Sequence, residues 1–162
     1  MILVRHAKSD WGQDGLSDIE RPLNERGKKD APEMANRLKA RKLHIDLFVS
    51  STAKRARKTA KYFAEEFDVK KDDIKLVEDL YLATTSAFQK TISELSDKHD
   101  VVAVFSHNPG ITEFANSLTN VRIDDMPTCS LFALNIDTDS WSSFEDAEKK
   151  FLFFDYPKNA LG

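Results

Sequence analysis

Hydrophobic residues in this chain fall into short continuous runs, the pattern expected of strands that are buried on both faces. These runs are residues 1–4, 46–50, 74–77 and 101–105. The run at 101–105 (VVAVF) is the strongest and the one at 74–77 is the weakest. Apolar residues at helical spacing lie between and after the runs. The expected helices cover residues 24–41, 53–67, 88–95 and 111–118.

The pattern of hydrophobic and polar positions changes in the last forty residues. Two further strand patterns, 131–136 (LFALNI) and 151–154 (FLFF), are separated by a polar stretch without a convincing helix. A connection with no crossover helix favours an antiparallel orientation for at least one of them. We therefore expect one domain over residues 1–162, a three-layer α/β/α sandwich around a six-stranded, mixed and mainly parallel sheet.

Helix boundaries carry their own signals. Asn24 is a plausible N-cap for the first helix, and Ser51 or Thr52 for the second. Pro32 lies inside the first helical pattern and removes one backbone donor. Either that helix kinks at Pro32 or its regular part begins near Asp30.

Composition narrows the possible functions. The net charge of −3 argues against a nucleic-acid-binding surface as the main purpose. The single cysteine, Cys129, excludes an internal disulfide and a multi-cysteine zinc site, which favours a reducing compartment. Because the chain lacks a secretory segment and an apolar span of about 20 residues, we expect no membrane association and place the protein in the cytoplasm.

Polar side chains follow three of the predicted strands. Arg5 and His6 follow the first, the segment 50–55 with Arg55 follows the second, and His107 follows the fourth. The carboxyl ends of parallel strands share one edge of a sheet, so these groups can meet in one crevice. Two arginines and two histidines beside a helix N-terminus suit a dianion, and a phosphoryl group is the obvious candidate.

Residues 7–23 have no clear period and predict a loop over this strand edge, long enough to be functional. Within the loop, Lys8, Ser9 and Arg21 either reach the bound anion or are solvated. We take Ser9, and Asn108 beside His107, as additional candidates for phosphate contacts.

Three segments carry a family resemblance. LVRHAKS resembles the Arg-His-Gly signature of the histidine phosphatase superfamily, which includes phosphoglycerate mutases. STAKRARKTA and SHNPGI are similar to its second and third motifs. More narrowly, RHAKSDW, ERPLNERG, EDLYLA, HNPG and the closing YPKNAL resemble SixA-type phosphohistidine phosphatases. The resemblance implies a phosphoglycerate mutase-like fold.

The resemblance also implies roles for individual residues. His6 would be the nucleophile that becomes phosphorylated, and Arg5, Arg55 and His107 would surround the phosphoryl oxygens. A neutral imidazole has a free lone pair, and its ordinary pKa of about 6.5 leaves much of it deprotonated at pH 7. No metal or cofactor is required. The expected ligands are phosphate or sulfate, and the expected substrate is a phosphorylated protein or a small phosphoester.

The chain departs from the superfamily pattern in two places. Ala7 replaces the usual glycine after the first histidine. Glu78 and Asp79 lie where phosphatases of alcohol esters carry a general acid, but EDLYLA does not reproduce that motif. Because imidazole is a better leaving group than an alkoxide, a missing acid favours phosphohistidine as the substrate. Two alternatives stay open: a phosphatase of small monoesters that uses Glu78, and a non-catalytic phosphate-binding module.

Overall fold

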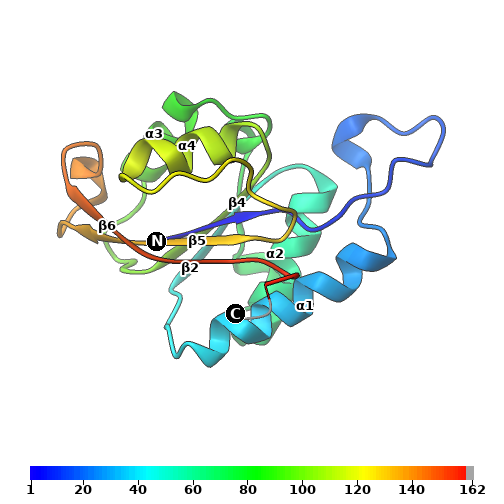
Figure 1. Ribbon diagram of the computed structural model, residues 1–162, viewed down its shortest axis with the longest axis horizontal. Coiled ribbons are helices and arrows are strands. Elements are labelled where there is room, and N and C mark those ends of the chain that lie inside the picture. The colour runs from blue at the N-terminus through cyan, green and yellow to red at the C-terminus, as the bar shows by residue number, and fades with distance from the viewer. Residues whose placement is uncertain (160–162) are drawn as a thin grey trace.

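A six-stranded sheet with the strand order β3-β2-β4-β1-β5-β6 forms the centre of the molecule (Figure 1). It is seen in a computed structural model that describes residues 1–159. The strands are β1 (Ile2–Arg5), β2 (Leu47–Ser51), β3 (Lys75–Val77), β4 (Val102–Ser106), β5 (Leu131–Asp137) and β6 (Glu148–Asp155). The predicted Ala160 and Leu161 of the closing motif lie outside the described residues.

Strand directions confirm the predicted mixed sheet. β4 is parallel to β1 and β2, and β2 is parallel to β3. β5 is antiparallel to both of its neighbours, β1 and β6. In the register, Arg5 lies opposite Ser106, and Ser50 lies opposite Phe105. The carboxyl ends of β1, β2 and β4 therefore share one edge of the sheet.

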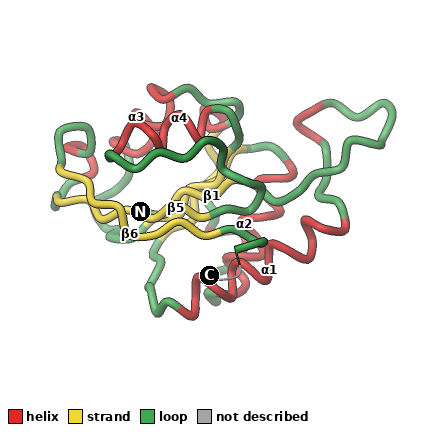
Figure 2. Tube along the Cα trace, viewed as in Figure 1, coloured by secondary structure: helices red, strands yellow, loops and turns green. Residues whose placement is uncertain are grey.

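Four helices cover the two faces of the sheet. They are α1 (Glu25–Ala40), α2 (Lys54–Glu66), α3 (Thr85–Ser93) and α4 (Gly110–Leu118). α1 and α2 lie on one face and α3 and α4 on the other (Figures 1 and 2). Successive strand residues point to opposite faces of the sheet and pack into a separate hydrophobic core on each face. Phe105 packs with Phe63 of α2, whereas Val104 belongs to the core of α3 and α4. The three-layer α/β/α architecture is confirmed.

The first residues of α1 and α2 can be compared with the helix starts that the sequence predicts. The Asn24 side chain accepts from the Gly27 backbone N–H, as predicted, and α1 then runs without interruption through Pro32. The alternative prediction, that the regular part of this helix begins near Asp30, is therefore wrong. The apolar side chains of this helix are fully buried, and their burial outweighs the one hydrogen bond that proline removes.

The predicted cap of α2 is also wrong. Its N-cap is Ala53, with no side-chain cap, rather than Ser51 or Thr52. The Ser51 hydroxyl accepts from the Ala53 N–H but also contacts His107. Its position at the end of β2 places it at the strand edge instead of at the helix terminus.

Among residues 1–159, none of the helices has the length and apolar character needed to cross a bilayer. The connection from β1 to α1 extends away from the sheet (Figure 1) and contains a short 3₁₀ helix, Asp18–Glu20. The Lys8 carbonyl accepts from the Asn24 N–H at 3.0 Å, which holds this loop against the start of α1.

Gly27 allows that close approach, because a Cβ atom there would lie 2.1 Å from the Lys8 carbonyl oxygen. Gly27→Ala forces the backbone apart, so we expect it to lower the free energy of unfolding by about 1–3 kcal/mol in urea denaturation. Lys29→Ala, an exposed change on the same turn, is the control and changes stability little. Equal stability of the two variants would show that the contact is not tight.

Candidate active site

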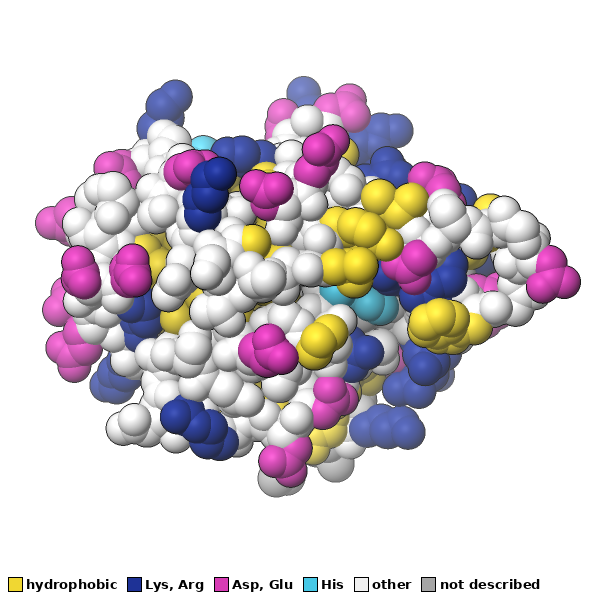
Figure 3. All heavy atoms as spheres, turned by 90° about the horizontal axis from the view of Figure 1, so that it is seen from above, with side chains coloured by type: hydrophobic (Ala, Val, Ile, Leu, Met, Phe, Trp, Pro, Cys, Tyr) yellow, Lys and Arg dark blue, Asp and Glu magenta, His cyan; other side chains and the backbone are white. Residues whose placement is uncertain are grey.

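Two histidines occupy adjacent strand ends at the carboxyl edge of the sheet. His6 follows β1, His107 follows β4, and their ring centroids are 5.1 Å apart. Both are buried, with 7% and 2% of their surface exposed. In Figure 3 histidine side chains line a hollow bordered by hydrophobic side chains and by lysines and arginines. The predicted convergence of strand ends is therefore present.

Hydrogen bonds fix the orientation of His6. Its Nδ1 lies 2.7 Å from the Ala7 carbonyl oxygen, which can only accept, so Nδ1 carries the proton. The Ala7 N–H donates to the Thr59 hydroxyl of α2 at 2.9 Å, which anchors that carbonyl. This assigns the lone pair of the neutral ring to Nε2.

His107 is held by the end of β2. Its Nε2 lies 2.7 Å from the Ser51 hydroxyl oxygen, which also accepts from the Ala53 N–H at 3.2 Å. The hydroxyl proton of Ser51 can then be donated to Nε2, so that Nδ1 is the protonated nitrogen. Nδ1 is buried and has no hydrogen-bond partner among residues 1–159. A free N–H donor of this kind is suited to an anion.

Burial keeps both imidazoles neutral. Desolvation, then the nearby Arg55, lowers the pKa of His107 to about 3. Desolvation, then His107, lowers the pKa of His6 well below its ordinary value. A neutral ring at neutral pH is the nucleophilic form.

Arg5 and Arg55 flank the histidines. Arg5 at the end of β1 donates to the Met126 carbonyl at 2.6 Å and lies 3.6 Å from Asp125. Arg55 in the first turn of α2 donates to the Asp18 carbonyl at 2.7 Å and to its carboxylate at 3.0 Å. The Nε atoms of both arginines are buried and unpartnered within the described residues. The four residues predicted to surround the phosphoryl group, Arg5, His6, Arg55 and His107, thus lie together.

Asp18 is a site residue that sequence reasoning missed. Its carboxylate accepts from Tyr81, from Arg21 at 3.0 Å and from Arg55. The hydrogen bond from Tyr81, and then those from the two arginines, hold the pKa of Asp18 far below its usual range. Asp18 is therefore ionised and can only accept. Its position in a single 3₁₀ turn of the β1–α1 loop gave no periodic signal, although it lies two residues before the ERPL segment.

Tyr81, which sequence reasoning also missed, stands beside His107. Its ring meets the His107 ring edge to face at 5.5 Å between centroids, and it follows the 3₁₀ turn Glu78–Leu80 after β3. Glu78, the predicted acid, is exposed on that turn, and its carboxylate has no hydrogen bond or ion pair within the described residues.

The two further phosphate candidates are engaged with protein groups. The Ser9 hydroxyl accepts from Arg21 at 2.8 Å. The Asn108 amide donates to Asp125 and accepts from Thr112 at 2.6 Å, so it fastens the loop after α4 beside Arg5. That Ser9 and Asn108 contact phosphate remains a prediction.

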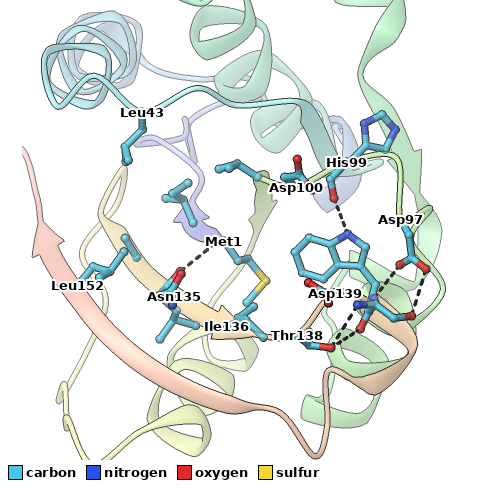
Figure 4. A pocket seen from close by; sticks show the side chains of 16 residues that line it. Met1, Leu43, Asp97, His99, Asp100, Asn135, Ile136, Thr138, Asp139 and Leu152 are labelled. Atoms are coloured by element: carbon cyan, nitrogen blue, oxygen red, sulfur yellow. Dashed lines mark hydrogen bonds between the residues drawn. The ribbon is translucent and has the colours of Figure 1, made fainter.

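A separate pocket of about 250 Å³ lies at the opposite, amino edge of the sheet (Figure 4). Its polar groups bond to one another. The Trp141 indole donates to the His99 carbonyl at 2.7 Å, and Asp97 accepts from the Trp141 N–H at 2.8 Å. These contacts hold the turn before β6 against the connection between α3 and β4, which is a structural task. Within residues 1–159, no group of three or more histidine, cysteine or acidic side chains is arranged to hold a metal.

The fold and the histidine pair define an α/β enzyme site for an anionic substrate. The model of the histidine phosphatase superfamily (branch 1) matches residues 1–81. An uncharacterised chloroplast protein of Arabidopsis thaliana is 30% identical over 149 residues, covering 87% of this chain and 68% of its own length. The chain belongs to the histidine phosphatase superfamily and is a phosphatase by class.

Two solved structures share the architecture. The putative phosphohistidine phosphatase SixA from Agrobacterium tumefaciens matches with a TM-score of 0.80 and 26% identity, covering 96% of each chain. A protein histidine phosphatase SixA complexed with tungstate matches with a TM-score of 0.82 and 21% identity, covering 98% of this chain and 97% of that one. Within the superfamily the structure is of the SixA type.

The lowered histidine pKa values predict how stability depends on pH. The unfolded chain binds protons near pH 6.5, whereas the folded chain resists protonation to about pH 3 at His107. The free energy of unfolding therefore falls as pH falls below 6.5, by up to about 1.4 kcal/mol per pH unit for each buried histidine. Urea denaturation from about pH 7.5 to about pH 4.5 measures this slope.

His107→Gln removes one of the two groups and should reduce the slope by about half. His99→Gln, at the opposite edge of the sheet, should leave it unchanged. A wild-type stability that stays level over this range would contradict the burial of neutral histidines.

Proposed function

We propose that this protein hydrolyses phosphohistidine on other proteins through a phosphorylated His6. The proposal rests mainly on the ionisation state of Asp18, the carboxyl group that lies at the pocket. Asp18 is held ionised by Tyr81, Arg21 and Arg55, so it has no proton to give a leaving group. Glu78, the other candidate acid, is exposed on the turn after β3. A site without a positioned acid favours a substrate whose leaving group departs readily.

In the proposed first step, the lone pair on His6 Nε2 attacks phosphorus and the P–N bond of the substrate breaks. The substrate imidazole departs as a neutral ring when its other nitrogen carries a proton taken from water. An alkoxide has no equivalent nitrogen, so it needs a proton from the enzyme. In the second step, water attacks phosphorus, the bond to His6 breaks, and inorganic phosphate leaves.

The cationic groups stabilise the phosphoryl group while it is transferred. The Nε–H groups of Arg5 and Arg55, and Nδ1–H of His107, are buried donors at the site that lack partners within residues 1–159. Donors that are already in place lower the barrier without rearrangement. We assign Asp18 the task of holding the Arg55 guanidinium by its two terminal nitrogens, so that Nε remains for the phosphoryl oxygen. The pocket would bind phosphate, sulfate or a related oxyanion by the same donors.

The likeness to SixA structures also supports this proposal, because one of them is a protein histidine phosphatase bound to tungstate. The competing function is hydrolysis of small phosphate monoesters, which requires Glu78 to supply a proton. Activity towards different leaving groups separates the two.

We expect kcat/KM to be highest for a phosphohistidine peptide, intermediate for p-nitrophenyl phosphate and lowest for glycerol phosphate. Only the alkyl ester demands protonation at departure. Glu78→Gln keeps the size of the side chain and removes the acid, so it should leave all three values nearly unchanged. Glu113→Gln, an exposed change on α4, is the matched control.

The competing function makes the opposite prediction. Glycerol phosphate would be the best substrate, and Glu78→Gln would lower its turnover by about 10²- to 10⁴-fold, the usual contribution of a general acid. That result would identify a small phosphate ester, and not phosphohistidine, as the substrate.

A further inference from the structure

A groove lined by basic side chains lies beside the phosphoryl pocket. It has a volume of about 370 Å³ and runs between the end of the β1–α1 loop and α2. Its lining is Pro22, Leu23, Lys28, Lys54, Arg57, Lys58 and Lys61, which contains five cations and no carboxylate. The whole chain has a net charge of −3, so the positive charge of this groove is opposite in sign to that of the molecule as a whole.

Helix geometry explains why the cations form a row. Lys54, Arg57, Lys58 and Lys61 recur at intervals of three and four residues, which places them along one side of α2. The row extends over about 10 Å of helix. The opposite side of α2 carries Ala56, Ala60 and Phe63 into the core, so the basic row is the side that faces solvent.

The positive charge of this row is largely uncompensated. Within residues 1–159, Lys54, Arg57 and Lys61 form no ion pair, and the Arg57 Nε is buried without a hydrogen-bond partner. Lys58 contacts the ring of Tyr62, and only Lys28 is paired, with Glu25. A row of unpaired cations attracts a negatively charged partner.

The groove is next to the site in the chain as well as in space. Lys54 precedes Arg55 of the pocket by one residue, and Pro22 follows Arg21, which binds Asp18. The groove therefore offers a surface for the neighbouring residues of a protein whose phosphorylated side chain enters the pocket. The buried Leu23 and the half-buried Pro22 supply an apolar floor for them.

We propose that this groove, hereafter the α2 groove, docks an acidic segment of the protein that carries the phosphoryl group. The inference rests on the proposed function, because it assigns the substrate a protein surface rich in aspartate and glutamate beside the phosphorylated residue. Exposed lysines on flexible stems suit a run of solvated carboxylates, which needs no fixed geometry. Docking raises kcat/KM for the protein substrate and leaves small substrates unaffected.

The test compares two phosphohistidine peptides of equal length, one flanked by four glutamates and the other by four glutamines. Each exposed charge pair changes affinity by a factor of about 1.5 to 5, so the wild type should prefer the acidic peptide about tenfold at low salt. Near 1 M salt, where the screening length is about 3 Å, the preference should disappear.

Lys58→Glu/Lys61→Glu reverses two charges of the α2 groove outside the pocket. We expect it to abolish the preference while turnover of p-nitrophenyl phosphate stays unchanged. Lys90→Glu/Lys98→Glu makes the same change in net charge with exposed lysines on and after α3. This control should retain the preference, which excludes a general effect of charge.

Binding of a fluorescent, unphosphorylated acidic peptide separates the two proposals. If phosphohistidine is not hydrolysed but the peptide still binds the wild type and not the Lys58/Lys61 variant, the function fails and the docking stands. If both phosphohistidine peptides are hydrolysed equally well, the docking is overturned and the function stands. Binding to phosphatidylglycerol vesicles through the same lysines, without any peptide preference, would assign the α2 groove to a membrane surface and also overturn the proposal.

Discussion

Parallel pairing of β4 with β1 on one side and with β2 on the other is the constraint on which the site depends. It satisfies the backbone groups of three buried strands and forces their carboxyl ends to one edge. His6, Ser51 and His107 leave the sheet at that edge, although they are distant in sequence. A shift of register between β1 and β4 would move one histidine away from the other, and a shift between β2 and β4 would move Ser51 away from His107.

The polar groups at this edge form an ordered set of contacts. Thr59 fixes the Ala7 backbone and thereby His6, Ser51 fixes His107, and Asp18 fixes Arg55. Each reactive group is thus held through a second side chain from a different element. Such support fixes the orientation of these groups and prepares the site for charge before a substrate arrives.

Sequence patterns located most of the fold and part of the site. The run VVAVF and the strand-end residues Arg5, His6 and His107 lie where they were expected, because continuous apolar runs are a local signal. The contributions of Asp18 and Tyr81 depend on contacts 63 residues apart, so no local pattern could indicate them. The continuous helix through Pro32 similarly reflects burial against the sheet, which outweighs local propensity.

The most direct test of this account is the location of the phosphoryl group on the enzyme. The Nδ1–H of His6 is engaged by the Ala7 carbonyl, which leaves Nε2 to attack. Rapid quenching in base during turnover of a phosphohistidine peptide, followed by peptide mapping and ³¹P NMR, should find a phosphoramidate on His6 at Nε2. His6→Ala should yield none and have no activity. A phosphoryl group at His6 Nδ1 or on His107, or turnover by His6→Ala, would contradict the account.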